Sequence, residues 1–497
     1  MFFVDTVETT GLGNRSYLAG GTDTAVAVDP PRDIDRVLAA AHRRGVRIAY
    51  VAETHVHNDY VSGALDLARI TGARCLVPAG AGVSFPHTPV ADGDTVTVDG
   101  GAGGAVGAGG AEGARGPGGT GGPGGSGGGG GAPGVELRAL ATPGHTPHHT
   151  SYVLTHGGSA VAAFTGGSLL IGTVGRPDLV EPRLTESLAR AQHASAHRLA
   201  RELDDAVPVL PTHGFGSFCS ATRSEGESTT IGAERAANAA LTQDVDAFVT
   251  GLLAGLDDVP AYYAHMGPAN AAGPAPVDLT PPRPADAGEI AARLAAGEWV
   301  VDLRGRVAFA AGHLAGSLNF EGDGKLATYL AWLIPWGKPV TLLAATADEL
   351  AAAQRELVRV GIDRPAAAAT GGPASWARAG EPLGFFPRGT FTDLAAARKE
   401  RDDVVVLDVR RATERATAHI EGSAHLPLHT LYGREAGVPD GTVWVHCGSG
   451  LRATVAASLL AAVGRDVVLV DDVFEPEATA RAGLPVVDGD GRPHDPA

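Results

Sequence analysis

One cysteine of this chain stands in a setting that makes a thiol reactive. Cys447 opens the hexapeptide CGSGLR, which ends at Arg452. Glycines let successive backbone N–H groups point into one concavity, where they can bind an anion. A guanidinium adds a full positive charge, and both features favour the thiolate, which is the nucleophilic form. We therefore predict that Cys447 and Arg452 are catalytic and that the residues between them cradle the sulfur: Gly448, Ser449, Gly450 and Leu451.

The flanking residues place this loop between a strand and a helix. The run TVWVHC, residues 442–447, is apolar and rich in β-branched side chains, and the helix-like run TVAASLLAAV follows at 454–463. In open α/β sheets, ligands bind at the carboxyl ends of strands, and a helix N-terminus adds positive potential there. The alternative is a small buried core cysteine, which the Gly-x-Gly spacing and Arg452 disfavour.

A second group of residues has the types that bind a metal ion. Its members stand near the ends of strand-like runs: His55, His57, Asp59, His145 and His213. One such histidine is usually structural, but several at strand-to-loop transitions can aim their nitrogens into one cleft. We therefore predict a metal site, with a metal-free scaffold as the alternative.

Composition divides the chain into parts that could hold these two centres. Strand-like and helix-like runs alternate through residues 1–250, which predicts a layered α/β domain. Within it, the run 100–134 consists almost wholly of Gly, Ala and Pro, so we expect a disordered surface loop. Residues 268–284 are rich in Pro and Ala, which is typical of an interdomain linker.

After this linker the sequence repeats itself at a constant offset. Five residues correspond in the two copies: Asp302, Arg304, His313, Gly316 and Ser317 match Asp408, Arg410, His419, Gly422 and Ser423. We therefore predict two related α/β domains, at 285–384 and 388–490. In the first copy, Ala344 and Ala345 stand where the cysteine should be, and no glycine-rich loop follows. The first copy is therefore expected to be catalytically silent.

The net charge and the cysteine content limit which partners the chain is expected to bind and which cellular compartment it is expected to occupy. The formal net charge of −17 argues against nucleic acid and anionic membranes as partners, because both require a basic face. Three cysteines, odd in number and far apart, argue against a disulfide framework and for a reducing compartment. The N-terminus has no secretory pattern, and no apolar run is long enough to span a bilayer. We expect a cytoplasmic protein, for which a homodimer is one option.

The second repeat resembles the rhodanese family. The resemblance rests on the loop CGSGLR, on Asp408 and Arg410, and on the segment from His419 to Ser423. It implies that Cys447 carries sulfane sulfur as a persulfide and passes it to a thiol or another acceptor. It also implies thiosulfate-like donors, whose anionic group would lie in the cradle of the loop.

The first region resembles the persulfide dioxygenase branch of the metallo-β-lactamase superfamily, whose fold is an αββα sandwich. The matching segments are THVHND, TPGHT, FTGGSLLIGTVGRPDL and PTHGFGSFC. The resemblance implies a mononuclear Fe(II) held by two histidines, here His55 and His145, and one aspartate. Gly167 stands where that aspartate belongs, and Tyr60 replaces a histidine that a two-metal site would need. The expected fold class is therefore α/β, with an αββα sandwich followed by two α/β rhodanese-like domains.

Because Gly167 stands in place of the expected carboxylate, the sequence leaves the identity of the metal open. Two histidines and one carboxylate suit Fe(II) and oxygen chemistry, whereas a histidine-rich set without a carboxylate suits Zn(II) and hydrolysis. Asp59 or Asp178 could replace the missing carboxylate. Arg176 could bind an anionic substrate, such as the glutathione part of a persulfide, or could form a structural ion pair with Asp178.

Three functions follow from these patterns. The leading hypothesis is a sulfur-metabolism enzyme that oxidises a persulfide with O₂ and transfers sulfane sulfur through Cys447. The second is a zinc-dependent thioester hydrolase, similar to glyoxalase II, with an attached sulfurtransferase. The third is a metal-free binding scaffold that serves Cys447.

Overall fold

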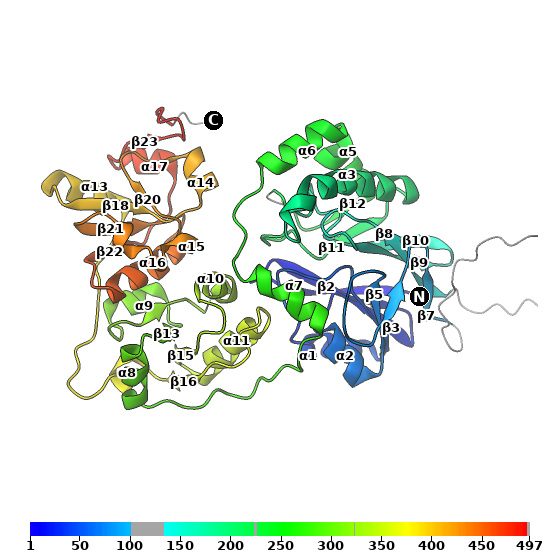
Figure 1. Ribbon diagram of the computed structural model, residues 1–497, viewed down its shortest axis with the longest axis horizontal. Helices are drawn as coiled ribbons and strands as arrows, with labels where there is room; N and C mark the ends of the chain where they lie inside the picture. The colour runs from blue at the N-terminus through cyan, green and yellow to red at the C-terminus, as the bar shows by residue number, and fades with distance from the viewer. Residues whose placement is uncertain (101–133, 223–225, 323, 495–497) are drawn as a thin grey trace, which may run out of the picture. The chain divides into compact units, whose positions relative to one another are not determined.

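The computed structural model describes residues 1–100, 134–222, 226–322 and 324–494 (Figure 1). The chain forms two compact units: Met1–Val259 with Tyr263–Val277, and Pro260–Tyr262 with Asp278–Ala497. Apart from its two end residues, the glycine-rich run 100–134 lies outside the described residues. Within the described residues, no helix is long and apolar enough to cross a membrane.

Two six-stranded sheets form the centre of the first unit. The first sheet has the order β1–β2–β3–β4–β5–β6, with strands Phe3–Thr9, Asn14–Gly20, Thr24–Val28, Arg47–Ala52, Arg74–Pro78 and Thr88–Val90. The second has the order β12–β11–β10–β9–β8–β7, with strands Thr229–Thr230, Pro208–Pro211, Ser159–Gly166, Thr150–His156, Val135–Ala141 and Thr95–Asp99. Strands β3 to β6 pair in parallel, as do β10 and β11, while the other pairs are antiparallel.

The two sheets pack face to face, and helices cover their outer faces. Between the sheets, the rings of Tyr17 on β2 and Phe164 on β10 lie 5.3 Å apart within one apolar core. Outside the first sheet, α1 (Asp35–Arg44) and α2 (Ala64–Thr71) bury their apolar faces. Outside the second sheet lie α3 to α6, which are Thr185–Glu202, Ile231–Ala237, Ala239–Thr242 and Val245–Ala254. This arrangement confirms the αββα sandwich.

One expectation about the linker is wrong. Residues 268–272, the beginning of the predicted linker, form the last part of α7 (Tyr263–Ala272). Their low complexity resembles a linker, but Met266 and Asn270 of this helix are buried against the first unit. The helix and the residues up to Val277 belong to that unit, which therefore extends beyond residue 250.

The second unit contains two parallel sheets of matching order. The first has the order β14–β13–β15–β16, with strands Leu318–Asn319, Trp299–Asp302, Val340–Ala344 and Ala367–Thr370. The second has the order β20–β18–β21–β22–β17, with strands Ala424–His425, Val404–Asp408, Thr442–His446, Val467–Val470 and Arg388–Gly389. A two-stranded sheet pairs β19 (His419–Ile420) with β23 (Val486–Val487).

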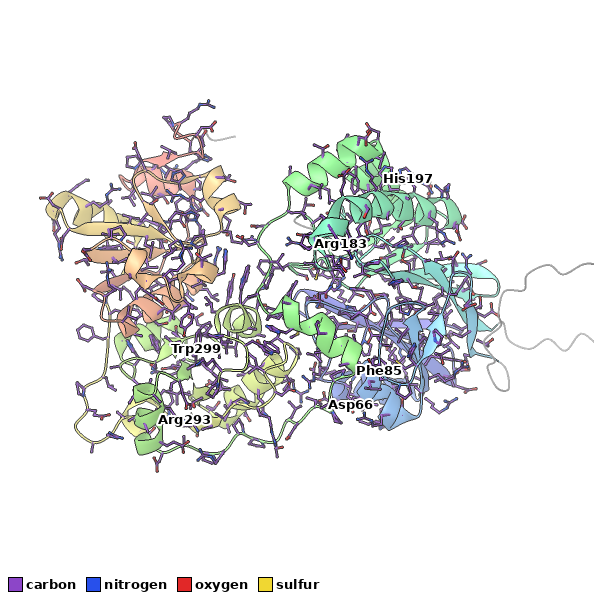
Figure 2. All side chains as sticks on the ribbon, in the orientation of Figure 1. Asp66, Phe85, Arg183, His197, Arg293 and Trp299 are labelled. Carbon is purple, nitrogen blue, oxygen red and sulfur yellow. The ribbon has the colours of Figure 1, made fainter. Side chains whose placement is uncertain are left out.

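Helices follow the strands in both repeats, as the repeated sequence requires. The first repeat has α8 to α12, which are Ala287–Ala295, Arg306–Ala311, Leu326–Leu333, Ala347–Val358 and Pro373–Trp376. The second has α13 to α17, which are Phe391–Glu400, Ala412–Thr417, Leu428–Leu431, Leu451–Ala462 and Pro476–Arg481. Both repeats contribute to one apolar core, which includes Trp299 of β13 (Figure 2) and Leu460 of α16.

Helix α16, which follows the cysteine loop, is held by the first repeat. The Thr454 hydroxyl donates to Oδ1 of Asn319 on β14 at 2.8 Å, and the Asn319 N–H donates to the Ser458 hydroxyl at 3.0 Å. These side chains are buried, so the contacts are shielded from water. The first repeat therefore packs directly against the helix that begins at the cysteine loop of the second.

Candidate functional site

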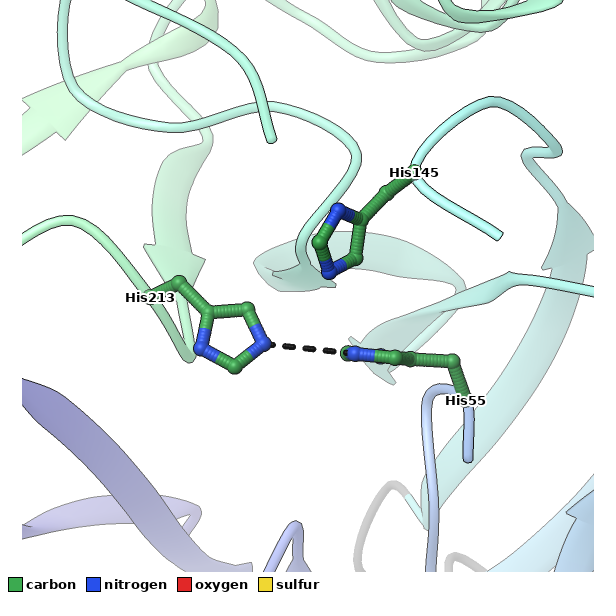
Figure 3. A group of neighbouring side chains, drawn as sticks. All are labelled: His55, His145 and His213. Carbon is green, nitrogen blue, oxygen red and sulfur yellow. Dashed lines mark hydrogen bonds between the residues drawn. The ribbon is translucent and has the colours of Figure 1, made fainter. Parts of the chain in front are cut away.

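Three imidazoles converge between the two sheets of the first unit (Figure 3). His55 follows β4, His145 follows β8 and His213 follows β11, so each is presented by the carboxyl end of a strand. One nitrogen of each ring lies within 4.8 Å of the others, and Nε2 of His55 and Nε2 of His213 are 3.2 Å apart. Nε2 of His145 is buried and has no hydrogen-bond partner among the described residues. These three nitrogens fit a single metal ion.

Burial keeps two of the three imidazoles in the form that binds metals. Burial and the neighbouring imidazoles together lower the pKa of His55 well below its usual value and that of His145 to about 3. Nδ1 of His145 donates to the Arg176 carbonyl at 2.8 Å, and Nδ1 of His213 lies 3.2 Å from Oδ1 of Asn14. Both contacts place the proton on Nδ1 and leave the lone pair on Nε2, which faces the cluster.

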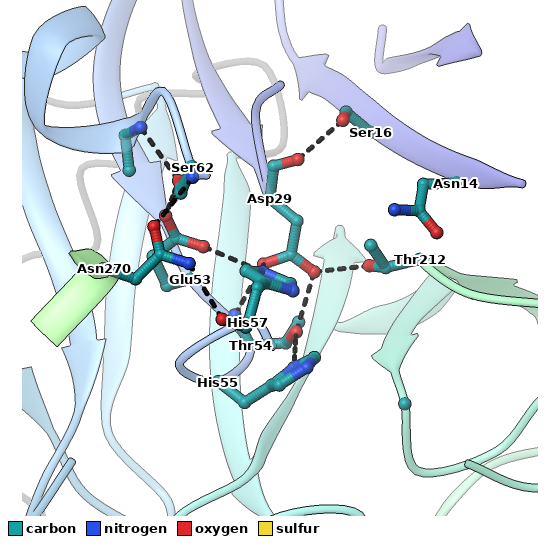
Figure 4. A network of polar contacts seen from close by, with 12 residues as sticks. Asn14, Ser16, Asp29, Glu53, Thr54, His55, His57, Ser62, Thr212 and Asn270 are labelled. Atoms are coloured by element: carbon teal, nitrogen blue, oxygen red, sulfur yellow. Dashed lines mark hydrogen bonds and ion pairs between the residues drawn. The ribbon is translucent and has the colours of Figure 1, made fainter. Parts of the chain in front are cut away.

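Asp29 is buried beside the cluster and binds the two loops that carry His55 and His213 (Figure 4). Its carboxylate accepts hydrogen bonds at 2.7 Å from both the N–H and the hydroxyl of Thr54, and another from the Thr212 hydroxyl. Thr54 and Thr212 immediately precede His55 and His213. Asp29 has a φ of 48°, the left-handed region that side chains other than glycine rarely adopt. The buried carboxylate therefore holds both histidine loops from a strained position.

Gly167 leaves the space that the His145 ring fills. A Cβ added to Gly167 would lie 2.2 Å from Cδ2 of His145, and one added to Gly175 would lie 2.7 Å from its Nδ1. A carboxylate at position 167 is therefore incompatible with this ring position. The two-histidine, one-carboxylate set of the resemblance is not formed at residue 167, and the imidazole of His213 is the third donor present.

Nε2 of His57 points toward two carboxylates, while its ring lies beside that of His55, with centroids 4.1 Å apart. Its Nε2 donates to Glu53 at 3.0 Å and lies 3.2 Å from a carboxylate oxygen of Asp29. Burial opposes the charged form, but these two carboxylates outweigh it and raise the pKa of His57 to about 10. Its Nδ1 is buried without a hydrogen-bond partner among the described residues, and His57 belongs with Asp59 and His213 to a second group of possible metal ligands.

Asp59 lies on the other side of His213. Its Oδ2 accepts from Nδ2 of Asn14 at 2.8 Å and lies 3.2 Å from Nδ1 of His213, and its Oδ1 has no partner among the described residues. Asp59, His57 and His213 form a second group whose ligand atoms lie within 4.8 Å of one another. Asp59 thus supports His213 directly and lies outside the three-imidazole group.

Arg176 is buried, and its guanidinium is hydrogen-bonded to neighbouring residues. Its Nε and Nη2 bind both oxygens of Asp178 at 2.7 and 2.8 Å, and Nη2 also donates to the Asp257 carbonyl at 2.6 Å. The residue is 2% exposed. These contacts match the structural ion pair with Asp178, and they leave no exposed guanidinium to bind a substrate.

Asn270 is a residue of this site that sequence reasoning missed. Its Nδ2 donates to the carbonyls of His57 and Tyr60, both at 2.8 Å, and its Oδ1 accepts from the Ser62 N–H at 2.9 Å. One side chain on α7 therefore binds the loop that carries His57 and Asp59. The Pro- and Ala-rich surroundings of Asn270 gave no signal of this contact, which joins residues more than 200 positions apart.

A cavity of about 510 Å³ borders the histidine loops. Its lining includes Val56 and Asn58, which flank His57, and Thr146, which follows His145. Tyr263 and Gly267 of α7 line it as well. Its volume and its mixture of apolar and polar walls are typical of a small-molecule site.

The cysteine loop lies where the sequence predicted it, between β21 and α16. Cys447 is 1% exposed, and the Ser449 N–H points at its Sγ at 3.5 Å. Gly450 caps α16 with a φ of 90°, and a Cβ there would lie 2.9 Å from Nε of Arg306. Arg452 binds Glu414 through two contacts, Nη1 to Oε2 at 2.5 Å and Nη2 to Oε1 at 2.7 Å. One backbone N–H of the loop therefore points at the buried thiol, and the guanidinium at the end of the loop is paired with Glu414.

The first repeat lacks this loop. There β15 ends at Ala344, α11 begins at Ala347, and Ala345 takes the place after the strand that Cys447 has in the second repeat. The connection is two residues shorter than the one that carries Cys447 in the second repeat.

Comparisons with known proteins agree with this division. Residues 9–213 match the metallo-beta-lactamase superfamily, and residues 391–475 match the rhodanese-like domain. The chain therefore joins a metallo-beta-lactamase superfamily domain to a C-terminal rhodanese-like domain. This confirms both resemblances and the fold class.

Several individual proteins are similar to the first domain. The human mitochondrial persulfide dioxygenase ETHE1 is 25% identical over 242 residues, which cover 47% of this chain and 74% of that protein. Two hydroxyacylglutathione hydrolases, from Methylobacillus flagellatus and Acidiphilium cryptum, are 28% and 29% identical and cover 31% and 41% of this chain. The chain spans only 49% and 65% of their lengths.

Among solved structures, a metallo-beta-lactamase from Staphylococcus aureus has a similar fold. Its TM-score is 0.61 at 24% identity, and the match covers 75% of this chain and 99% of that one.

Proposed function

We propose that this chain is an enzyme of sulfur metabolism with two active centres. The first unit would oxidise the persulfide of a low-molecular-weight thiol to sulfite with O₂, and the second would transfer sulfane sulfur through Cys447. The observation that carries the proposal is the presence in one chain of a buried three-imidazole cluster beside a cavity and a thiol in a glycine-rich loop. The similarity to a persulfide dioxygenase supports it.

In the first unit, His55, His145 and His213 would hold the metal. Iron there would supply the redox chemistry that O₂ requires. The three donors are uncharged, so they leave the full charge of a cation to attract an anionic sulfur group. The cavity beside them would hold the thiol carrier, for which a glutathione-type thiol is our proposal.

The overall oxidation balances without a further reductant. The sulfane sulfur of R–S–SH gains two oxygen atoms from O₂ and one from water, and it leaves as sulfite with two protons. The thiol R–SH is regenerated, and O₂ accepts the four electrons that the sulfur loses.

In the second unit, the Cys447 thiolate would attack the sulfane sulfur of a donor. A new S–S bond forms, and the S–S bond of the donor breaks with its electron pair on the departing group. Arg452 and the N–H groups from Gly448 to Gly450 would stabilise the resulting anionic persulfide. A thiolate or cyanide acceptor then removes the outer sulfur and restores the Cys447 thiolate.

Oxygen uptake tests the first half. Iron-loaded protein with glutathione persulfide should consume O₂ and release sulfite, and no uptake by a fully loaded sample would refute the dioxygenase activity. Mass spectrometry tests the second half, because a sulfane donor should add the mass of one sulfur at Cys447.

A second candidate is a zinc-dependent thioester hydrolase with an attached sulfurtransferase. The position of the His145 ring against Gly167 favours it, because three imidazoles without a carboxylate suit zinc, which would activate water for hydrolysis. The two similar hydroxyacylglutathione hydrolases also favour it. Zinc in the purified protein together with thioester hydrolysis would support this candidate, whereas iron with oxygen uptake would exclude it.

A further inference from the structure

Some contacts of the second unit occur in both repeats and build the fold, whereas others occur only in the repeat that has the thiol. Nε and Nη2 of Arg304 bind Asp302 at 2.9 and 2.6 Å, and the same atoms of Arg410 bind Asp408 at 3.0 and 2.7 Å. The first repeat has no cysteine at the loop, yet it keeps this ion pair. The Asp–Arg pair is therefore a feature of the fold in both copies.

The Glu414–Arg452 pair occurs only in the copy that has the thiol. Helices α14 and α9 correspond from first to last residue, which places Ala308 at the position of Glu414. Helices α16 and α11 also correspond in length, which places Asp348 at the position of Arg452. Both partners are thus absent where Cys447 is absent, so this pair accompanies the chemistry of the loop.

The Glu414 carboxylate also lowers the net positive charge that an anionic sulfur donor meets at the loop. The Arg452 guanidinium lies against the loop, since a Cβ on Gly448 would be 3.4 Å from its Nη2. Nε of Arg411 lies 3.3 Å from the same Glu414 carboxylate. Although burial raises it, the hydrogen bond and charge of Arg452 lower the pKa of Glu414 to about 2, so the carboxylate is ionised at neutral pH. Two arginines and one glutamate leave a net charge of one positive unit.

The first repeat contributes to the same surroundings. Burial raises the pKa of the Tyr329 phenol on α10, and the charges of Arg452 and Glu414 also act on it.

We propose that Glu414 determines donor specificity at Cys447, so that the loop prefers singly charged organic persulfides to doubly charged thiosulfate. The proposal rests on the sulfur-transfer function proposed above. With R–S–S⁻, the Cys447 thiolate takes the terminal sulfur to form Cys447–S–S⁻, the S–S bond of the donor breaks, and R–S⁻ leaves with the electron pair. With thiosulfate, the same attack releases sulfite. Glu414 repels the second negative charge of thiosulfate and holds Arg452 against the loop in both reactions.

The ratio of two donor activities tests this proposal. Sulfur transfer to cyanide is measured with thiosulfate and with glutathione persulfide, and kcat/KM is compared for the wild type, Glu414→Gln, Glu414→Asp and Glu421→Gln. Glutamine keeps the length of the side chain but removes its charge, so the thiosulfate-to-persulfide ratio should rise about tenfold. Glu414→Asp keeps the charge and should retain a ratio near that of the wild type. Glu421→Gln removes an exposed charge from the same repeat and should change nothing.

The outcomes distinguish the two proposals. An unchanged ratio in Glu414→Gln, or an equal fall of both activities, would overturn the specificity role, as would a tenfold rise in Glu414→Asp. If the wild-type protein transfers sulfur from neither donor, the proposed function of Cys447 fails instead. Thermal unfolding of each variant identifies any loss of activity caused by loss of the fold.

Discussion

The position of the His145 ring against Gly167 leads to a prediction opposite to the one that the family pattern suggests. The pattern has an aspartate at this position, so Gly167→Asp would be expected to complete an iron site. In this chain, any Cβ at 167 would lie 2.2 Å from Cδ2 of His145, where ordinary van der Waals contact needs at least 3.4 Å. The ring must therefore retreat by about 1.2 Å, which is far more than the roughly 0.2 Å that metal–ligand distances tolerate.

The retreat separates the His145 nitrogen from those of His55 and His213. Loss of a residue that only orients a ligand typically weakens metal binding about 10- to 100-fold, so loss of the ligand itself should weaken it at least about 100-fold. We expect this loss in Gly167→Ala, and we expect Gly167→Asp to bind no more iron than the wild type. Gly251→Ala is the matched control, because a Cβ there meets nothing within 4 Å.

Competition with a chromophoric chelator measures the affinity of each variant, and elemental analysis after dialysis measures the metal retained. Wild-type affinity in Gly167→Ala would refute the argument, because it would mean that His145 is not a ligand or that its ring moves without cost. Tighter iron binding in Gly167→Asp would likewise favour the family's carboxylate set over three imidazoles.

Three further predictions concern other contacts. Cys447→Ser should abolish sulfur transfer while lowering the free energy of unfolding by about 1–3 kcal/mol, measured by denaturant titration, because it replaces a buried thiol with a buried hydroxyl. Asp408→Asn should lower that free energy by about 3–5 kcal/mol, because it leaves the buried guanidinium of Arg410 without its charged partner. Asp302→Asn should lower it by less, because Arg304 is only partly buried. Burial raises the pKa of Asp408, but His446 and Arg410 together lower it below 3.8, so its stabilisation is present above that pH and should disappear as the pH falls further. Asn270→Ala should weaken metal binding about 10- to 100-fold, measured by chelator competition, by releasing the His57 loop.

Much of the local structure was predictable from residue patterns. Within the predicted alternation of strands and helices, residues 24–28 and 47–52 form β3 and β4, and residues 64–71 form α2. Alternation of apolar residues and a glycine after each helix were sufficient, since Gly45 and Gly72 both adopt the left-handed conformation that ends a helix. The reactive loop was predictable for the same reason, because its strand, glycines and helix are contiguous in sequence.

The arrangement around the histidines was less predictable, because it depends on contacts between distant residues. The sequence pattern could not show that Glu53 and Asp29 bind Nε2 of His57. It could not show that Asn270, in a segment resembling a linker, binds the His57 loop. Gly167 appeared from sequence only as the loss of a ligand, whereas the structure shows that it makes room for the ring of His145.

The central claim is that the first unit oxidises a persulfide at a metal held by three histidines. Its most direct test measures O₂ consumption and sulfite release together, using iron-loaded protein and glutathione persulfide, with His213→Ala as the comparison. We predict equal amounts of O₂ consumed and sulfite formed by the wild type, and neither by His213→Ala. No oxygen uptake by the fully iron-loaded wild type, or full activity in His213→Ala, would contradict the account.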